Sequence, residues 1–148
     1  MLEHMFQGAF EHNLDNKGRL MLPVSQRAAL ATGVFVTRGI DHCLWVYPRA
    51  RWEQIAEKIH GVSRMKKNTR SFVRFFYGAA AELELDKQGR VLIPAYLREY
   101  ADLEDEVVVV GAEDHLEVWN AAAFRQADAE VAQDPEALAE SLSELELL

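Results

Sequence analysis

Residues 14–23 read LDNKGRLMLP, and residues 85–94 read LDKQGRVLIP. The second copy lies 71 positions after the first and keeps Leu, Asp, Gly, Arg and Pro in the same order. The match extends at the same offset to Arg27 and Arg98. A repeat at a fixed offset redefines the folding unit. We therefore expect two half-length units, related by an approximate twofold axis, that share one core.

Length and composition fit one globular domain. A chain of 148 residues, 49% apolar and 27% charged, can bury one sizeable core, and no apolar run approaches the ~18 residues of a membrane span. Residues 1–4 do not begin a secretory signal, and we expect Met5 to be the natural start. A single cysteine, Cys43, cannot form an internal disulfide, which favours a cytoplasmic location.

Charge is divided unevenly along the chain, whose net charge is −8. Residues 1–74 carry 12 basic and 6 acidic side chains, a net charge of +6, whereas residues 75–148 carry 4 and 18, a net charge of −14. Such asymmetry indicates a face that binds a polyanion on an otherwise acidic body.

Each copy of the motif is expected to form a turn between two strands. The spacing of apolar residues, together with glycine and proline at the ends of segments, predicts the elements of the first unit. These are strands at 6–14, 19–22, 35–38 and 44–47, a short helix at 25–31 and a helix from Pro48 to Gly61. The second unit repeats this plan with strands at 82–85, 90–93, 107–110 and 116–119, a helix at 95–100 and a helix capped by Asn120. The fold class is therefore α+β, mainly β, with peripheral helices.

These elements divide the chain into a first repeat at 5–61, a connecting helix at 62–77, a second repeat at 78–124 and an acidic C-terminal tail at 125–148. The connecting helix, from about Ser63, has an apolar stripe expected to be buried, made of Met65, Thr69, Phe72, Val73 and Phe76. Its basic side either lies along phosphates or is solvated, and consists of Lys66, Lys67, Arg70 and Arg74.

The tail has seven acidic residues and no basic one from residue 126 onward. Leu138, Leu142 and Leu145 are spaced for a short amphipathic helix, but this composition favours a mobile or loosely docked segment. Its charge repels DNA, so we expect it to lie away from a DNA-binding face.

Two arginines are the main candidates for contacts with nucleic acid. Arg19 and Arg90 each follow the turn of one motif copy, and a guanidinium offers a fork of donors that fits a phosphate or the O6/N7 edge of guanine. Lys17 and Lys87 add positive charge beside them. Two such turns related by a twofold axis match the quasi-twofold repeat of a duplex groove.

The remaining motif residues are expected to shape the turns. Asp15 and Asp86 are predicted to accept turn amides or to hold the arginines, because a carboxylate that faces phosphate would be repelled. Gly18 and Gly89 can adopt the left-handed conformation. The alternative is a tight hairpin turn in which the arginine only satisfies an internal carboxylate.

The motifs also carry a family resemblance. Phe6-Gln7-Gly8, both motif copies, and Tyr47-Pro48 with Trp52 resemble the MraZ family of bacterial transcriptional regulators. Each unit is similar to the AbrB/SpoVT-type DNA-binding hairpin, whose pattern is Asp-x-x-Gly-Arg followed by an apolar stretch and Pro. The resemblance covers residues 5 to about 124.

This resemblance implies an AbrB-like swapped-hairpin barrel, homo-oligomeric rings, and binding of direct repeats in the promoter of the division and cell-wall gene cluster, with nucleoid association. In that family the Asp-x-x-x-Arg signatures bind double-stranded DNA, here Asp15 to Arg19 and Asp86 to Arg90. Gln88 replaces the lysine before the second glycine, which predicts unequal contributions from the two sites. Candidates for the ring contacts are the aromatic residues Trp45, Trp52, Phe75 and Tyr77, of which we expect at least half to pack in the core instead.

An enzyme is the first alternative, and we expect none. The paired Asp turns are reminiscent of the shared-proton dyad of aspartic proteases, but no Ser-Gly or Thr-Gly follows either Asp, and an arginine four residues on would keep both carboxylates ionised. The five histidines and Cys43 show no spacing typical of metal ligands or of a nucleophilic triad. No cofactor, metal, small-molecule substrate or membrane partner is predicted.

The second alternative is an antitoxin-like interaction protein of the same barrel type. In that case the acidic tail would bind a basic partner protein. The tail's charge favours this interpretation, whereas two motif copies in one chain do not, since such antitoxins usually carry a single copy.

Overall fold

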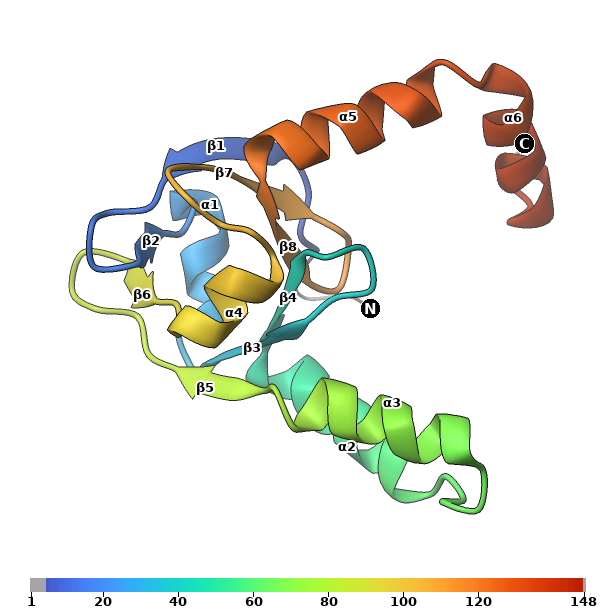
Figure 1. Cartoon of the computed structure of the whole chain (residues 1–148), viewed down its shortest axis with the longest axis horizontal. Coiled ribbons are helices and arrows are strands. Elements are labelled where there is room, and N and C mark those ends of the chain that lie inside the picture. The colour runs from blue at the N-terminus through green and yellow to red at the C-terminus, as the bar shows by residue number, and fades with distance from the viewer. Residues whose placement is uncertain (1–4, 148) are drawn as a thin grey trace.

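A computed structural model describes residues 5–147, so the expectation about residues 1–4 lies outside the described residues. The strands, in chain order, are β1 (Ala9–Asn13), β2 (Arg19–Met21), β3 (Val34–Arg38), β4 (Leu44–Pro48), β5 (Ala81–Leu83), β6 (Arg90–Leu92), β7 (Glu106–Gly111) and β8 (Leu116–Asn120). The helices are α1 (Val24–Arg27), the 3-10 turn η1 (Ala28–Leu30), α2 (Arg49–His60), α3 (Lys67–Tyr77), α4 (Ala95–Tyr100), α5 (Ala121–Ala132) and α6 (Pro135–Glu144). Figure 1 shows their arrangement.

The strand order reflects the sequence repeat. Six strands form one sheet in the order β1-β7-β8-β4-β3-β5, and β2 and β6 form a separate two-stranded sheet. The counterparts in the two repeats are β1 and β5, β3 and β7, and β4 and β8. Exchanging each strand for its counterpart gives the same order read from the other edge of the sheet. The first strand of each repeat pairs antiparallel with the third strand of the other, as in Phe10↔Val109 and Phe35↔Glu82. The twofold relation between the repeats is therefore present in the backbone pairing.

The strands do not close into the expected swapped-hairpin barrel. The larger sheet is open, with β1 and β5 as its edges, and β2 and β6 pair only with each other among the described strands. Each of these two strands has three residues between a glycine turn and a proline-led helix, Pro23 or Pro94. Proline donates no backbone hydrogen bond, so each strand ends before its proline and the β2–β6 ladder stays short.

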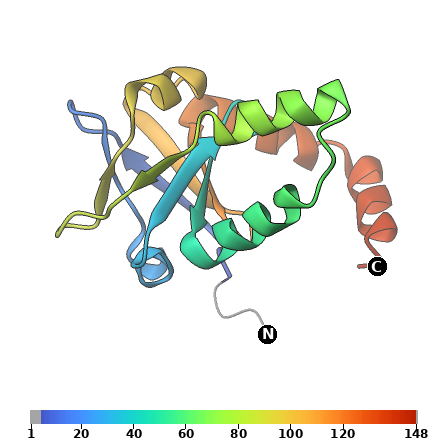
Figure 2. The same cartoon turned by 90° about the horizontal axis from the view of Figure 1, so that it is seen from below.

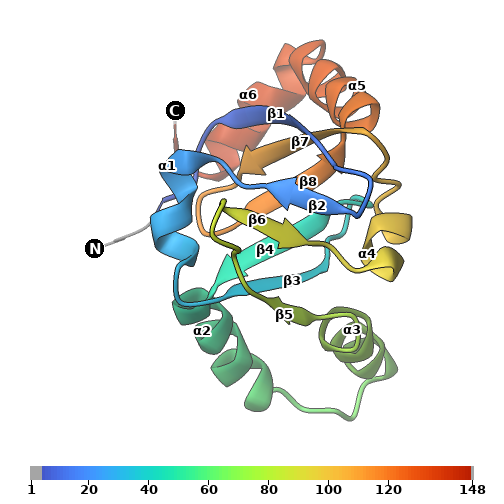
Figure 3. The ribbon, with the colours of Figure 1, turned by 90° about the vertical axis from the view of Figure 1, so that its left-hand side faces the viewer.

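The main core lies between the six-stranded sheet and a layer made of β2, β6, α1 and α4 (Figure 3). Leu20, Leu22, Val91 and Ile93 are almost fully buried there against sheet residues such as Val109. Each fully buried side chain of this size stabilises the fold by about 1.5–3 kcal/mol relative to exposure. The motif's apolar residues therefore hold the layer that carries its polar ones.

The opposite face of the sheet carries an aromatic cluster beneath α2 and α3. Phe35, Tyr47, Trp52 and Phe76 are buried in it, and Trp52 stacks on Phe35 with ring centroids 5.4 Å apart. Trp52 is therefore a packing residue and not an exposed aromatic. The other three aromatic residues proposed for ring contacts are half-buried, and they are Trp45, Phe75 and Tyr77.

Two pairs of consecutive helices, α2–α3 and α5–α6, project away from the sheet (Figure 1). α3 begins at Lys67, later than predicted, and its expected buried stripe is wrong in part, because Met65 is 85% and Phe72 44% exposed while Phe76 is buried. The α2–α3 pair extends beyond the sheet edge, so only its base finds packing partners. There β3 holds the helix end, since Thr37 Oγ1 donates to the Phe76 carbonyl.

The C-terminal segment is helical, and it is loosely packed as its composition led us to expect. All α6 side chains except Leu142 are exposed, so its leucines form a helix stripe without a core beneath it. No helix within residues 5–147 is both long and apolar enough to cross a bilayer.

Candidate nucleic-acid interface

The β2–β6 ribbon separates its side chains into two faces. Leu20 and Val91 are paired at its centre, and both are buried in the core. Because side chains alternate along a strand, the flanking residues point the other way. The outer face of the ribbon consists of Arg19, Met21, Arg90 and Leu92, of which Leu92 is 54% exposed.

The first turn is built around Asp15. Its carboxylate Oδ1 accepts the backbone amides of Lys17 and Arg19, each at 2.9 Å, and its Oδ2 accepts Nε of Arg19 at 2.5 Å. Gly18 has φ of +85°, a left-handed conformation that a residue with a Cβ adopts only at a cost. The Asp thus fixes both the backbone of the turn and one edge of the guanidinium.

The second turn repeats this geometry. Asp86 accepts the amides of Gln88 and Arg90 at 2.9 and 2.8 Å and Nε of Arg90 at 2.8 Å, and Gly89 has φ of +81°. Replacing the first turn's lysine by Gln88 changes none of these bonds, because only its backbone amide is used. The two turns are equal in geometry and in net charge, and they differ in the position of the lysine, which is Lys17 in the first turn and Lys87 in the second.

Both carboxylates are stabilised in the ionised form. The backbone amide of Arg19, then its guanidinium and the amide of Lys17, lower the pKa of Asp15 to about 2 against the opposing effect of burial. The pKa of Asp86 is also lowered, chiefly by the hydrogen bond from the backbone amide of Arg90. Two ionised carboxylates, each with its own arginine, are the reverse of a dyad that shares one proton.

The guanidinium groups remain accessible beside these carboxylates. The side chain of Arg19 is 31% and that of Arg90 25% exposed. Within residues 5–147 the terminal nitrogens of Arg19 have no hydrogen-bond partner. Nη1 of Arg90 lies 4.0 Å from Oδ2 of Asp15. Lys17 and Lys87 are exposed on the turns. Each arginine is thus held through Nε and can donate outward through Nη1 and Nη2.

Comparison with known proteins matches this repeat to one family. The family model described as "MraZ protein, putative antitoxin-like" matches twice, over residues 5–75 and 76–143. The chain belongs to the MraZ family. The second MraZ match includes α5 and most of α6, so the family likeness does not end near residue 124, as the motifs alone suggested.

Relatives called "Transcriptional regulator MraZ" align over almost the whole chain. The one from Lactiplantibacillus plantarum is 49% identical over 138 residues, 93% of this chain and 98% of the relative. Those from Desulforamulus reducens and Moorella thermoacetica are 43% and 41% identical, covering 95% and 97% of this chain and 99% and 100% of the relatives.

Two further arginines support the turns in this MraZ-family chain. A Cβ on Gly18 would lie 2.5 Å from Nη1 of Arg98, and a Cβ on Gly89 would collide with the guanidinium of Arg27. Each arginine therefore covers the turn of the other repeat. The 71-residue offset between Arg27 and Arg98 was visible in the sequence, but only the structure shows that the two repeats exchange them.

Proposed function

We propose that this chain binds double-stranded DNA sequence-specifically through the outer face of the β2–β6 ribbon and regulates transcription. The observation that carries the proposal is the pair of outward arginines, each fixed at Nε and open at its terminal nitrogens. A two-stranded antiparallel ribbon fits the major groove, where a bidentate arginine reads guanine. The names of the MraZ relatives support a regulatory role.

The parts of the site have distinct proposed roles. Arg19 and Arg90 contact bases or phosphates, Lys17 and Lys87 contact phosphates, and the two aspartates and two glycines hold the turns. Leu92 and Met21, beside the arginines, can pack against a thymine methyl group. The exchanged pairing of first and third strands supports an AbrB-like swapped arrangement of the two repeats, with an open sheet in place of a barrel.

Self-association belongs to the same proposal. One ribbon offers few phosphate contacts and binds weakly at physiological salt, whereas linked copies that face successive direct repeats gain about 10²–10⁴ through effective concentration. We therefore propose a homo-oligomeric ring on direct repeats in the promoter of the division and cell-wall gene cluster, in the nucleoid of the cytoplasm.

Single substitutions of the ribbon arginines test the DNA contact. Arg19→Ala and Arg90→Ala should each weaken binding to a promoter fragment by about 1–3 kcal/mol in retardation titrations, with little change in thermal unfolding. Arg125→Ala, which removes an exposed arginine from α5, is the matched control and should bind as the wild type does. Undiminished binding by a variant that melts many degrees lower would show that the arginine is structural.

An antitoxin-like role is the second candidate. Seven carboxylates on α5, α6 and the last described residues form no ion pair within residues 5–147, and the description of the family model includes the term antitoxin-like. Size exclusion with and without a promoter fragment separates the two. A shift with DNA supports the regulator, and a shift only with a basic protein supports the antitoxin.

A further inference from the structure

The two projecting helix pairs occupy equivalent positions in the two repeats and carry opposite charge. We call residues 49–77, which form α2, α3 and their loop, the basic arm, and residues 121–147, which include α5 and α6, the acidic arm. The basic arm has eight basic and two acidic side chains, net +6. The acidic arm has one basic and seven acidic side chains, net −6. The two arms thus have equivalent places in the backbone and net charges of opposite sign.

The basic arm exposes both charge and apolar surface. Lys58, Lys66, Lys67 and Arg74 are exposed and form no ion pair within residues 5–147. Val62, Met65 and Phe72 lie along the same arm at 47%, 85% and 44% exposure. Exposed apolar side chains on the same element as exposed charges are typical of a protein contact.

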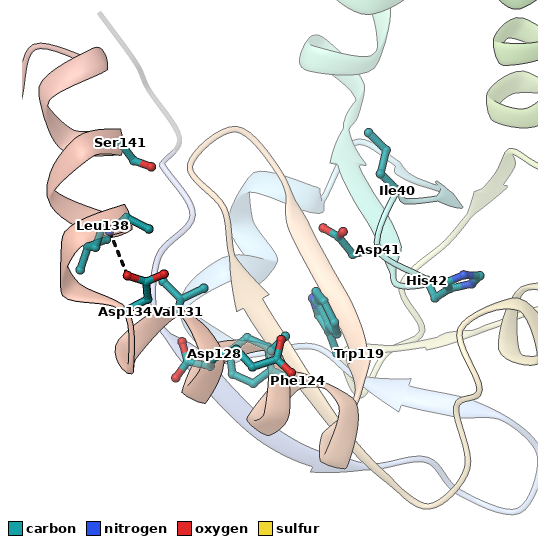
Figure 4. Close-up of a pocket in the computed structure, with 13 residues that line it drawn as sticks. Ile40, Asp41, His42, Trp119, Phe124, Asp128, Val131, Asp134, Leu138 and Ser141 are labelled. Atoms are coloured by element: carbon teal, nitrogen blue, oxygen red, sulfur yellow. Dashed lines mark hydrogen bonds between the residues drawn. The ribbon is translucent and has the colours of Figure 1, made fainter.

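The acidic arm borders a groove of about 870 Å³ between α5, α6 and the turn that joins β3 to β4 (Figure 4). Trp119 and Phe124 lie at its base, with their rings 5.7 Å apart, and Val131 and Leu138 line one side. The acidic residues that line it are Asp41, Asp128, Glu130 and Asp134. The groove therefore has an apolar floor and acidic residues along its lining, which complement the exposed apolar and basic side chains of the basic arm.

Neither arm shares a surface with the arginine ribbon. The motif turns lie at one side of the molecule and the tips of both arms at the other (Figures 1 and 2). The basic face of α3 is therefore separate from the proposed DNA contact of the ribbon. None of the residues that line the groove comes from the basic arm of the same chain.

We infer that the basic arm of one copy docks into the acidic-arm groove of the next, and that the opposite charges of the arms set a head-to-tail order of assembly. This inference rests on the proposed self-association. Contacts between two basic arms or between two acidic arms repel, so only unlike arms meet. A contact between two different surfaces propagates in one direction and closes into a ring when the rotation permits.

Charge reversal tests the order of assembly. The first variant carries Lys66→Glu and Lys67→Glu, and the second carries Asp128→Lys and Glu130→Lys. The first pair of changes lowers the charge of the basic arm from +6 to +2, and the second changes that of the acidic arm from −6 to −2. Each variant alone therefore sets like charges against each other at the substituted positions and should associate at least about 100-fold more weakly than wild type in light-scattering measurements at low salt. Mixed in equal amounts, or combined in one chain, the substitutions restore unlike pairs and should restore assembly.

Two controls accompany these variants. Glu84→Lys with Glu104→Lys reverses two exposed charges outside both arms and should assemble as the wild type does. Arg19→Ala with Arg90→Ala should lose DNA binding and assemble normally, which separates failure of the docking from failure of the proposed DNA contact. Thermal unfolding checks that each variant is folded, and the first variant stands as a test if the second is not.

Several results would overturn the inference. One is an assembly as heavy as that of the wild type for either reversed variant alone. Another is no recovery of assembly when the two variants are mixed, and a third is a wild-type protein that stays a single chain at every salt concentration. Loss of DNA affinity in the first variant without a change in mass would instead assign the basic arm to nucleic acid.

Discussion

At the scale of single residues, the turns depend on glycines that an arginine of the other repeat covers. Gly18 combines a left-handed backbone with close approach of Arg98, and Gly89 does the same with Arg27. The left-handed conformation and the collision are separate costs for any side chain at these positions. They can be measured separately.

We expect Gly18→Ala to lower the free energy of unfolding by about 1–2 kcal/mol from backbone strain alone, and further from the collision with Arg98. Adding Arg98→Ala should restore only the stability lost through the collision. Denaturant unfolding of the wild type, the two single variants and the double variant gives the interaction free energy between the two positions. Gly61→Ala is the control, because its Cβ would meet only the Lys58 carbonyl at 3.8 Å. Additive effects of the two substitutions would show that the arginine does not rest on the glycine.

A half-buried titratable group, His115, lies away from these turns. Nδ1 of His115 is 2.6 Å from Asp114, which also binds Nε of Arg51 at 2.7 Å, and the imidazole stacks on Tyr47. Burial by itself would lower the pKa of His115, but the carboxylates of Glu117 and Asp114 outweigh it and raise the pKa above 6.5. His115 therefore links β8 to α2 most strongly when it is protonated.

The pH dependence follows from these directions. A raised pKa means that His115 stabilises the fold fully below pH 6.5, and that this contribution is lost as the pH rises through the folded-state value. The free-energy difference between wild type and His115→Gln should thus be larger at about pH 6 than at about pH 9. An NMR titration should place the pKa of His115 above 6.5, and Glu117→Gln should lower it. A pKa below 6.5 would show that burial dominates.

At the scale of elements, the sequence predicted local structure well where turn residues and periodicity agree. α4 spans residues 95–100 as expected, and α2 lies between Pro48 and Gly61. It failed where burial depends on distant partners. The stripe that includes Met65 and Phe72 has helical spacing, but spacing does not reveal that α3 extends past the sheet.

Helix caps provide a prediction at this scale. Asn120 accepts the amide of Ala123 at 3.0 Å and donates to the carbonyl of Asp102 at 2.9 Å, so Asn120→Ala should lower the free energy of unfolding by about 1 kcal/mol. Asp134 caps α6 in the same way, accepting from Ala137 at 3.1 Å. Since α6 is almost wholly exposed, Asp134→Ala should reduce helical circular dichroism without moving the main unfolding transition. Equal shifts of that transition would show that α6 is part of the core.

At the scale of the whole molecule, the repeat predicted the twofold relation and the two matching turns, because both are encoded in 71-residue self-similarity. The open sheet, the exchange of Arg27 and Arg98, and the groove beside α6 depend on long-range pairing that spacing does not specify. The arrangement places the arginine ribbon and the two arms on opposite sides, so the proposed DNA contact and the proposed contact between copies use separate surfaces (Figure 1).

The proposed DNA-binding role of the ribbon can be tested by cleavage of DNA from a reagent attached to chosen positions. Cys43 is fully buried, so a cysteine introduced in place of Lys17, Lys87 or Lys66 is the reactive thiol to which an iron chelate can be attached. We expect chelates at positions 17 and 87 to cut a bound promoter fragment at defined sites within the recognised repeats, and a chelate at position 66 to leave it intact. Cutting from position 66 with none from 17 and 87 would contradict the account.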